Sequence, residues 1–349
     1  MIRVLVVDDS AVVREALTDE LNRETDIEVV GTAVDPYAAR DKIVALKPDV
    51  VTLDIEMPRM DGLTFLNRLM HHHPLPVVIV SSLATEQSEV ALRALALGAV
   101  DVVAKPSQWA PPDIPGRLAR AVRAAAAAKI RGRRTDDACQ SPAPLVPAPR
   151  GAEASCVIAM GASTGGTIAL ESLLRRLPAT APPVLIVQHM PPGFTEAFSR
   201  RLDHVSAMQV REAKDMEAVL PGVALLAPAG RHMVLQPGKS GYHVRVKEGP
   251  PVHFHRPSVD VLFRSVARGV GPDAIGVLLT GMGADGAAGL LEMRNAGAHT
   301  IAEAEESCVV FGMSRKAIEL GAAAEIVDID KMPQRLSKAW SKLEMGSTP

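Results

Sequence analysis

Hydrophobic residues before Lys105 fall into short runs rich in valine and isoleucine, separated by longer polar segments. Such β-branched runs are typical of buried strands, whereas Ala11–Arg23 and Glu86–Leu97 have the apolar spacing of amphipathic helices. The predicted strands are Ile2–Val7, Ile27–Thr32, Val50–Leu53, Val77–Val80 and Val100–Val103. Strands that alternate with helices form parallel sheets covered on both faces, so this part is predicted to be a doubly wound α/β domain.

A second alternation of the same kind occupies the rest of the chain. Its predicted strands are Cys156–Met160, Val184–Val187, Val223–Ala227, Ile275–Leu279 and Thr300–Glu303. The segment Val234–Val246 instead alternates like a β-hairpin, with its turn at Pro237–Gly241. This pattern predicts a second α/β domain with a mainly parallel sheet.

The two alternations are joined by a segment of different composition. A helical pattern runs through Arg117–Ile130, and Arg131–Ser155 is then rich in proline, alanine and charge. Such a composition cannot bury a core and is typical of an extended linker. The predicted organisation is a first domain at residues 1–122, a helical extension and linker at 123–154, and a second domain at 155–345.

Composition excludes several functional classes. The chain has 349 residues, 47% of them hydrophobic and 22% charged, with a net charge of −2. This balance is typical of globular domains and gives no electrostatic reason to expect nucleic-acid binding. No apolar run reaches the roughly 18 residues that a membrane span needs, and the first residues resemble a strand rather than a signal peptide. Three cysteines without C-x-x-C spacing favour a cytoplasmic protein with neither disulfide framework nor structural zinc.

Charged and hydroxyl side chains follow successive strands of the first domain. Asp8 and Asp9 end the first strand, Asp54 the third, Ser81 the fourth and Lys105 the fifth. Because the carboxyl ends of parallel strands meet at one edge, these groups are expected to lie together. Crowded carboxylates repel one another unless a cation intervenes, and all-oxygen ligands suit Mg²⁺. The predicted metal ligands are Asp8, Asp9, Asp54 and Glu56. The plainer alternative, solvated loop residues, is open for any one of these positions but not for the set.

These residues resemble the receiver domain of two-component response regulators, a flavodoxin-like fold. The matching stretches are Leu53–Gly62 and Ala104–Pro106. The resemblance implies that Asp54 accepts a phosphoryl group, which Lys105, Ser81 and the metal then hold. Val102 departs from the pattern, because receivers often carry an aromatic switch residue three positions before the lysine. How phosphorylation is transmitted is therefore not given by the pattern.

A serine, a histidine and an aspartate follow strands of the second domain. Ser163 lies within Gly161–Gly166, where glycines permit a sharp strand-to-helix turn, as in a nucleophile elbow. His189 ends the next strand, and Asp285 lies in the glycine-rich loop after Leu279. Together they supply a nucleophile, a base and an orienting acid. Singly, each has a plainer interpretation: a phosphate-binding or close-packed turn, a hydrogen-bonded core histidine, and a capping aspartate.

The order Ser163, His189, Asp285 argues against the α/β-hydrolases, in which the acid precedes the histidine. A triad that arose by convergence on another parallel-sheet scaffold is the natural inference. Main-chain N–H groups at Thr164 and in the loop of Met282 are predicted to form the oxyanion site.

The chain as a whole resembles the CheB family, chemotaxis response-regulator protein-glutamate methylesterases. The matching stretches are Gly161–Gly166, Val187–Phe194, His255–Val266, Leu279–Gly289 and Glu305–Gly312. The resemblance implies a Rossmann-like catalytic domain whose triad is Ser163, His189 and Asp285. It also implies methyl-accepting chemoreceptors as substrates, deamidation of certain receptor glutamines, and a chemotaxis histidine kinase as phosphodonor. The unphosphorylated receiver would restrict access to the catalytic site.

Three alternatives remain at this level. A transcriptional regulator would need a basic DNA-binding module where the second α/β alternation stands. A receiver-linked nucleotide-binding module would use Gly161–Gly166 to cradle phosphate. An esterase of the same family could also serve a signalling pathway other than chemotaxis.

Overall fold

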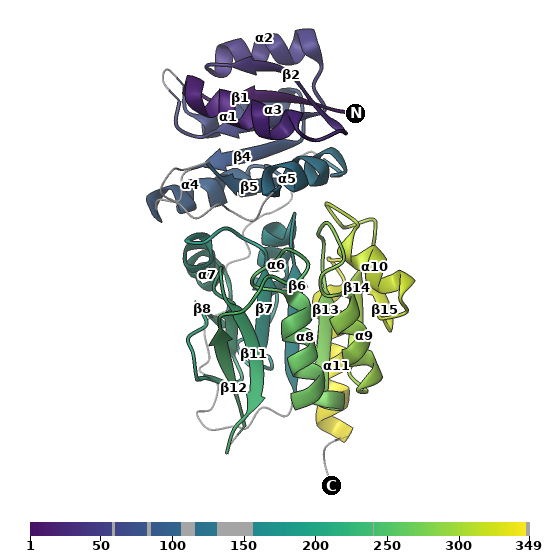
Figure 1. Cartoon of the computed structure of the whole chain (residues 1–349). Coiled ribbons are helices and arrows are strands. Elements are labelled where there is room, and N and C mark those ends of the chain that lie inside the picture. The colour runs from purple at the N-terminus through teal and green to yellow at the C-terminus, as the bar shows by residue number, and fades with distance from the viewer. Residues whose placement is uncertain (58–59, 82–84, 106–115, 131–155, 240, 347–349) are drawn as a thin grey trace. The chain divides into compact units, whose positions relative to one another are not determined.

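The computed structural model describes residues 1–57, 60–81, 85–105, 116–130, 156–239 and 241–346. The chain divides into two compact units, Met1–Ala138 and Cys139–Pro349 (Figure 1). Most of the predicted linker, from residue 131 onward, lies outside the described residues. The proposed boundary at residue 122 stays a prediction, and a helix, α5 (Arg117–Ala126), runs through that position.

The first unit is a five-stranded parallel sheet in the order β2-β1-β3-β4-β5. Its strands are β1 (Ile2–Val7), β2 (Ile27–Ala33), β3 (Val50–Asp54), β4 (Val77–Ser81) and β5 (Asp101–Ala104). Its other helices are α1 (Ala11–Asn22), α2 (Pro36–Leu46), α3 (Gly62–His72) and α4 (Thr85–Ala96). The predicted doubly wound sheet is confirmed, and its strand order reverses between β1 and β3, where such folds place their ligands.

The second unit is built on a seven-stranded parallel sheet in the order β15-β14-β13-β6-β7-β10-β8. Its strands are β6 (Val157–Ala162), β7 (Val184–Gln188), β8 (Gln209–Glu212), β10 (Val223–Leu226), β13 (Ala274–Leu278), β14 (His299–Glu303) and β15 (Glu325–Val327). Its helices are α6 (Gly166–Leu174), α7 (Phe194–Val205), α8 (Val259–Gly269), α9 (Ala287–Asn295), α10 (Met313–Glu319) and α11 (Met332–Gly346), with a 3₁₀ turn at Gly271–Asp273.

A small antiparallel sheet completes the second unit. The predicted hairpin is present as β11 (His232–Pro237) and β12 (Tyr242–Lys247), and β9 (Glu217–Val219) pairs with β12 as a third strand. Strands β8, β9 and β15 are only three or four residues long and were not predicted from the sequence. Such short strands have little pattern of their own and depend on the neighbours with which they pair.

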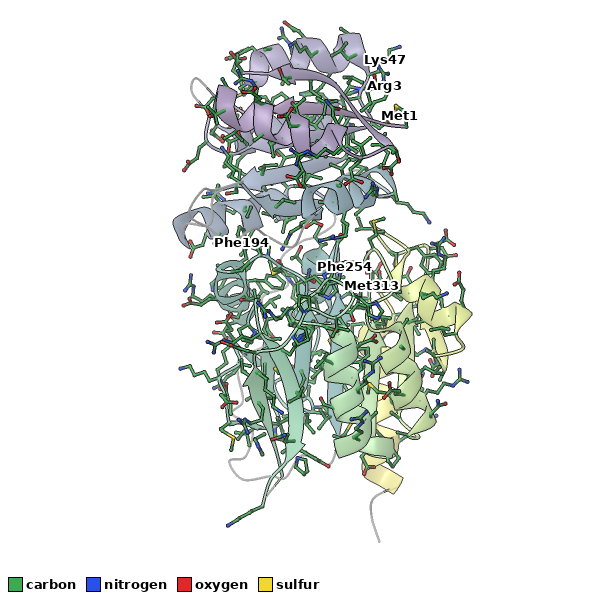
Figure 2. The ribbon with its side chains drawn as sticks, viewed as in Figure 1. Met1, Arg3, Lys47, Phe194, Phe254 and Met313 are labelled. Carbon is green, nitrogen blue, oxygen red and sulfur yellow. The ribbon has the colours of Figure 1, made fainter. Side chains whose placement is uncertain are left out.

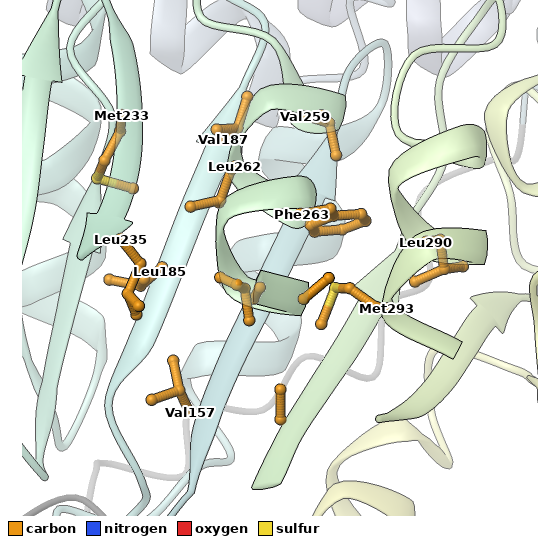
Figure 3. Packing of buried hydrophobic residues seen from close by; sticks show 14 of the residues in the cluster. Val157, Leu185, Val187, Met233, Leu235, Val259, Leu262, Phe263, Leu290 and Met293 are labelled. Carbon is orange, nitrogen blue, oxygen red and sulfur yellow. The ribbon is translucent and has the colours of Figure 1, made fainter. Parts of the chain in front are cut away.

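Helix α8 joins the small sheet to the rest of the second unit. Its apolar residues Val259, Leu262, Phe263 and Val266 have the spacing of one helix face, and all are fully buried. Figure 3 shows this face packed between Leu185 and Leu235 on one side and Leu290 and Met293 of α9 on the other. The helix therefore has a fixed position relative to the central sheet.

A glycine in β6 allows the start of α8 to approach the central sheet. A β-carbon added at Gly161 would lie 2.1 Å from Cγ1 of Val259, closer than real atoms come. The first turn of α8 is consequently held against the carboxyl end of β6. The sheet order also reverses between β6 and β13, so the loops after these two strands face the crevice in which open α/β sheets bind ligands.

Candidate active site

The loops that carry Ser163 and His189 leave neighbouring strands at the same sheet edge. Ala162 at the end of β6 pairs with Gln188 at the end of β7, and the His189 N–H donates to the Ala162 carbonyl over 3.1 Å. The Ser163 N–H donates to the carbonyl of Thr280, which follows β13, over 3.0 Å. All three predicted segments therefore meet at one edge of the sheet.

His189 and Asp285 are joined directly. The Nε2 atom of His189 lies 2.9 Å from Oδ2 of Asp285, and both side chains are buried. The other Asp285 contacts come from the start of α8: the Ser258 hydroxyl donates to Oδ1 over 2.7 Å, Val259 N to Oδ2 over 2.8 Å and Asp260 N to Oδ1 over 3.1 Å. Asp285 thus occupies a helix N-terminus, where negative charge is stabilised.

These donors decide the charge of Asp285. Burial alone raises the pKa of its carboxyl, but the hydrogen bond and charge of His189, with the donors Ser258 and Val259, outweigh burial and hold the pKa below its ordinary value. A carboxylate that accepts several hydrogen bonds behaves in this way. Asp285 is therefore an anion at neutral pH and can stabilise a positive charge on His189.

The same hydrogen bond fixes which nitrogen of His189 is free. With Asp285 ionised, Nε2 carries the proton that is donated to it. Nδ1 of His189 is buried and has no hydrogen-bond partner in the part of the chain that the structure describes. That nitrogen is therefore available to accept a proton.

Ser163 lies in a tightly held turn before α6. Its carbonyl accepts from Nε2 of Gln188 over 2.9 Å and from Gly166 N over 2.8 Å. Gly165, with φ of 79°, supplies the left-handed residue that this turn needs. Within the described residues the Ser163 hydroxyl and the imidazole are not hydrogen-bonded to each other. Such contacts are often long without substrate and shorten in the complex.

The loop of Met282 approaches the serine closely. A β-carbon added at Gly281 would lie 2.6 Å from Cβ of Ser163, so the two backbones are near contact. The Gly281 carbonyl accepts from Met313 N over 2.8 Å, which ties this loop to α10. Thr164 is buried beside Ser163, and Met282 is half-buried. The structure brings these two predicted oxyanion residues to one place, and their role stays a prediction.

A buried hydroxyl and a buried carboxyl are linked to the Ser163 turn by hydrogen bonds. The Thr280 hydroxyl donates to the Thr164 carbonyl over 3.0 Å, and Thr280 N donates to Oε2 of Glu303 over 2.8 Å. Burial raises the pKa of Glu303 to about 7, since the hydrogen bond from Thr280 offsets only part of the lost hydration. Neither Thr280 nor Glu303 was predicted as part of the site. Glu303 ends a predicted strand and belongs to no motif.

Residues of the His255–Val266 stretch also contribute to the site. Ser258 could have been found from the sequence as a helix cap, since it precedes the apolar face of α8 and its hydroxyl accepts from Val261 N. His255 carries no such signal, although its ring lies flat on that of His189. Only the tertiary structure reveals that contact.

The structure brings Asp8, Asp9 and Asp54 together with Lys105 at the β1/β3 edge of the first unit. Nζ of Lys105 lies 2.9 Å from Oδ2 of Asp8 and 2.9 Å from Oδ2 of Asp54, and both carboxylates are buried. Burial, and to a lesser degree the charge of Asp8, raises the pKa of Asp54 against the lowering effect of Lys105. Ser81 is buried at the end of β4, and its carbonyl accepts from Lys105 N over 2.8 Å.

The donor atoms in this cluster fit a hard cation. One carboxylate oxygen from each of Asp8, Asp9 and Asp54 lies within 4.8 Å of the others. An all-oxygen set of this kind suits Mg²⁺, which retains water in its remaining positions. Glu56 is exposed and outside this group, so its predicted role as a ligand stays a prediction. Val102 is buried in β5 at the position where many receivers have an aromatic residue.

No helix among the described residues is long and apolar enough to cross a membrane.

Known proteins match both units. The family model described as CheB methylesterase matches residues 158–336, and the response regulator receiver domain matches residues 4–113. A protein-glutamate methylesterase/protein-glutamine glutaminase of Syntrophus aciditrophicus is 52% identical over 96% of this chain and 98% of its own. The corresponding protein of Pectobacterium atrosepticum is 51% identical over 96% of each chain.

A solved structure matches the second unit. The crystal structure of the Thermotoga maritima CheB methylesterase catalytic domain is 37% identical, with a TM-score of 0.52, and covers 52% of this chain and 97% of that one. The DNA-binding and nucleotide-binding alternatives are therefore set aside. The chain belongs to the CheB family of receiver-linked protein-glutamate methylesterases/protein-glutamine glutaminases.

Proposed function

We propose that this methylesterase acts on methyl-accepting chemoreceptors with Ser163 as nucleophile, His189 as base and Asp285 as orienting acid. The observation that carries the assignment is the hydrogen bond between His189 and the ionised Asp285, at the sheet edge where Ser163 also lies. The substrates are γ-glutamyl methyl esters and certain glutamine side chains of these receptors.

Acylation begins when the Ser163 oxygen attacks the side-chain carbonyl carbon while Nδ1 of His189 takes the hydroxyl proton. The anionic Asp285 stabilises the imidazolium that forms. The N–H groups of Thr164 and Met282 stabilise the oxyanion, and losing one donor of this kind typically costs about 3–4 kcal/mol of barrier.

Collapse of the tetrahedral intermediate breaks the bond to the methoxy oxygen, which leaves as methanol with the proton held by His189. From a glutamine side chain the leaving group is ammonia. A water molecule then attacks the acyl-enzyme with His189 again as base, which releases the glutamate carboxylate and restores Ser163.

Asp54 is the proposed phosphoacceptor, and a chemotaxis histidine kinase is the proposed donor. Mg²⁺, held by Asp8, Asp9 and Asp54, would supply positive charge for the phosphoryl oxygens. Lys105 contributes a second positive charge, and the hydroxyl of Ser81, at the end of β4, is the proposed hydrogen-bond donor to the phosphoryl group. The receiver is proposed to restrict access to the catalytic site until Asp54 is phosphorylated, and the cytoplasm is the proposed location.

The decisive experiment measures methanol release from methylated receptor membranes by the full chain, with and without a small phosphodonor such as acetyl phosphate. We expect release that rises with the phosphodonor, and none from Ser163→Ala. That variant should still incorporate phosphate at Asp54, because the substitution lies outside the receiver unit. Methanol release retained by Ser163→Ala would show that Ser163 is not the nucleophile. If the unaltered chain hydrolyses other methyl esters but releases no methanol from receptor membranes, it serves another signalling pathway.

A further inference from the structure

A second imidazole lies directly on the proposed base. The rings of His189 and His255 are stacked with centroids 3.6 Å apart and planes only 4° from parallel. Aromatic pairs generally prefer offset or edge-to-face arrangements with larger centroid separations. The contact between His189 and His255 is closer than this, and the backbone just before His255 is in an uncommon conformation.

That backbone is a closed two-residue turn. Val252 N donates to the His255 carbonyl over 3.0 Å, and His255 N donates back to Val252 over 2.9 Å. The two central residues, His253 and Phe254, are both left-handed, with φ of 50° and 64°. Turns of this kind normally use asparagine or glycine, because a bulky side chain is strained there. Strain of this sort clusters at functional sites.

The turn has a second attachment to the same site. Nε2 of His253 lies 3.1 Å from Oδ2 of Asp260, which is fully buried. Asp260 N donates to Oδ1 of Asp285, and Oδ1 of Asp260 accepts from Gly289 N over 2.7 Å. The two histidines of the turn thus reach the two members of the His189–Asp285 pair, one by stacking and one through Asp260.

Phe254, between these histidines, has an exposed side chain. It is 65% exposed, and Figure 2 shows it at the end of the second unit where the carboxyl ends of the strands lie. The strained backbone is therefore not needed to bury its ring. What the left-handed turn secures is the orientation of the two histidines on either side.

A metal ion is a weaker explanation for this group. One ligand atom from each of His253, Asp260 and Asp285 lies within 4.8 Å of the others. However, the two oxygens of Asp285 already accept four hydrogen bonds, from His189, Ser258, Val259 and Asp260. A carboxylate has about four acceptor positions, so little capacity for a cation remains.

We propose that His255 is a positioning residue, which holds the imidazole plane of His189 so that the free nitrogen faces Ser163. The proposal rests on the serine–histidine mechanism given above. The hydrogen bond to Asp285 fixes one atom of the His189 ring but leaves the ring free to tilt about that contact. A flat ring on its face prevents the tilt and excludes water from that side.

The test uses the full chain, activated with acetyl phosphate, and compares His255→Ala, His255→Leu and His255→Phe. Two quantities are measured: kcat and KM for methanol release from methylated receptor membranes, and the rate at which a fluorophosphonate labels Ser163. We expect Ala and Leu to lower kcat and the labelling rate by about 10- to 100-fold, the usual effect of a misplaced catalytic group, with KM changed far less. Phe keeps a flat ring and should recover most of the loss.

Two further variants separate the ring from the turn. Phe254→Gly keeps the left-handed backbone and removes only the exposed ring, and His204→Ala changes an exposed histidine of α7. Both should leave the labelling rate within about twofold, since surface changes are usually small. A comparable loss in Phe254→Gly would assign the effect to the turn as a whole and overturn the role of the His255 ring.

Equal rates for His255→Leu and His255→Phe would also overturn the proposal, because any filler of similar size would then suffice. This comparison does not require the alanine variant to fold. Ser163→Ala distinguishes failure of the inference from failure of the mechanism. Full activity of His255→Ala beside an inactive Ser163→Ala contradicts the positioning role alone, whereas an active Ser163→Ala contradicts both.

Discussion

Hydrogen-bond donors set the properties of two of the buried carboxyl groups in the catalytic unit, Asp285 and Glu303. Asp285 is surrounded by four donors and stays ionised, whereas Glu303 receives one main-chain hydrogen bond from Thr280 and its pKa is raised by burial to about 7. The same side-chain chemistry thus gives a fixed charge at one position and a titrating group at the other.

Asp285→Asn should strongly lower kcat for methanol release. An amide offers one acceptor oxygen where the carboxylate has two, and its NH₂ would face N–H donors. It also cannot stabilise the imidazolium. We expect kcat to fall by about 10³- to 10⁴-fold, the size seen when a triad acid is neutralised. The rate of methanol release measures kcat, and Asp273→Asn, at an exposed position, is the control. A decrease in kcat of less than tenfold in Asp285→Asn would contradict the assigned role.

Glu303→Gln should change how stability depends on pH. The pKa of Glu303 rises from an ordinary 4.5 to about 7 on folding, so the folded state binds this proton more tightly. Its stabilising effect is complete below about pH 4.5 and is lost as pH rises through 7, about 3 kcal/mol in all. Glutamine keeps the acceptor for Thr280 N but cannot ionise. The free energy of unfolding of the variant should therefore not decrease as pH rises through 7, and at pH 8 it should exceed that of the parent.

Urea unfolding at several pH values would measure this effect. Trp340 of α11 is a natural probe of the catalytic unit, and Trp109→Phe makes it the single tryptophan of the chain. Glu319→Gln, an exposed carboxyl, serves as the matched control. If the parent and Glu303→Gln show parallel stability between pH 5 and 8, burial does not raise the pKa of this carboxyl.

At the scale of elements, helix α8 organises the active site. Its apolar face is part of the core, and its N-terminus supplies three of the donors to Asp285. The contact between Gly161 of β6 and Val259 fixes the distance of the start of α8 from the sheet. The packing of α8 and the position of these three donors therefore depend on the same close approach.

A double-mutant cycle tests this contact. Gly161→Ala should destabilise the catalytic unit by about 1–3 kcal/mol, because the added methyl group overlaps Val259. Adding Val259→Ala provides space, so the double variant should lose less than the sum, with a coupling of about 1–2 kcal/mol. Val327→Ala on β15, three strands from β6, should instead add to Gly161→Ala without coupling. Strict additivity with Val259→Ala would contradict the packing argument.

The strands illustrate what local patterns predict. Long buried strands such as β6 and β7, and the hairpin β11–β12, follow from runs and alternation that are visible in the sequence. β8, β9 and β15 could not be predicted, because three or four residues form a strand only when a neighbour is already in place. Their existence is a property of the sheet rather than of the segment.

On the scale of the whole molecule, two α/β units place their functional groups by one rule. In each, the residues lie at the carboxyl edge of the sheet around the point where the strand order reverses, which is between β1 and β3 in the receiver and between β6 and β13 in the catalytic unit. Each unit has its own core, and the Thermotoga maritima catalytic domain was solved by itself. The two activities can therefore be separated experimentally.

Regulation is testable by such a separation. Asp54→Asn should abolish the rise in methanol release caused by acetyl phosphate, since the amide cannot accept the phosphoryl group. A fragment that begins near Gly151 should be active without any phosphodonor. Basal release is compared among the full chain, the variant and the fragment at equal concentration. Equal basal activity of the unphosphorylated full chain and the fragment would contradict restriction by the receiver.

The sequence by itself determined the two parallel-sheet domains, the acidic cluster and the serine, histidine and aspartate. It did so because strand periodicity is local, and because residues at the ends of parallel strands must share an edge. Only the tertiary structure decided that Nε2 of His189 faces Asp285, that His255 lies on its ring, and that Glu303 lies beneath the Ser163 turn. These contacts join segments far apart in the chain, and they depend on side-chain direction and burial, which no local pattern records.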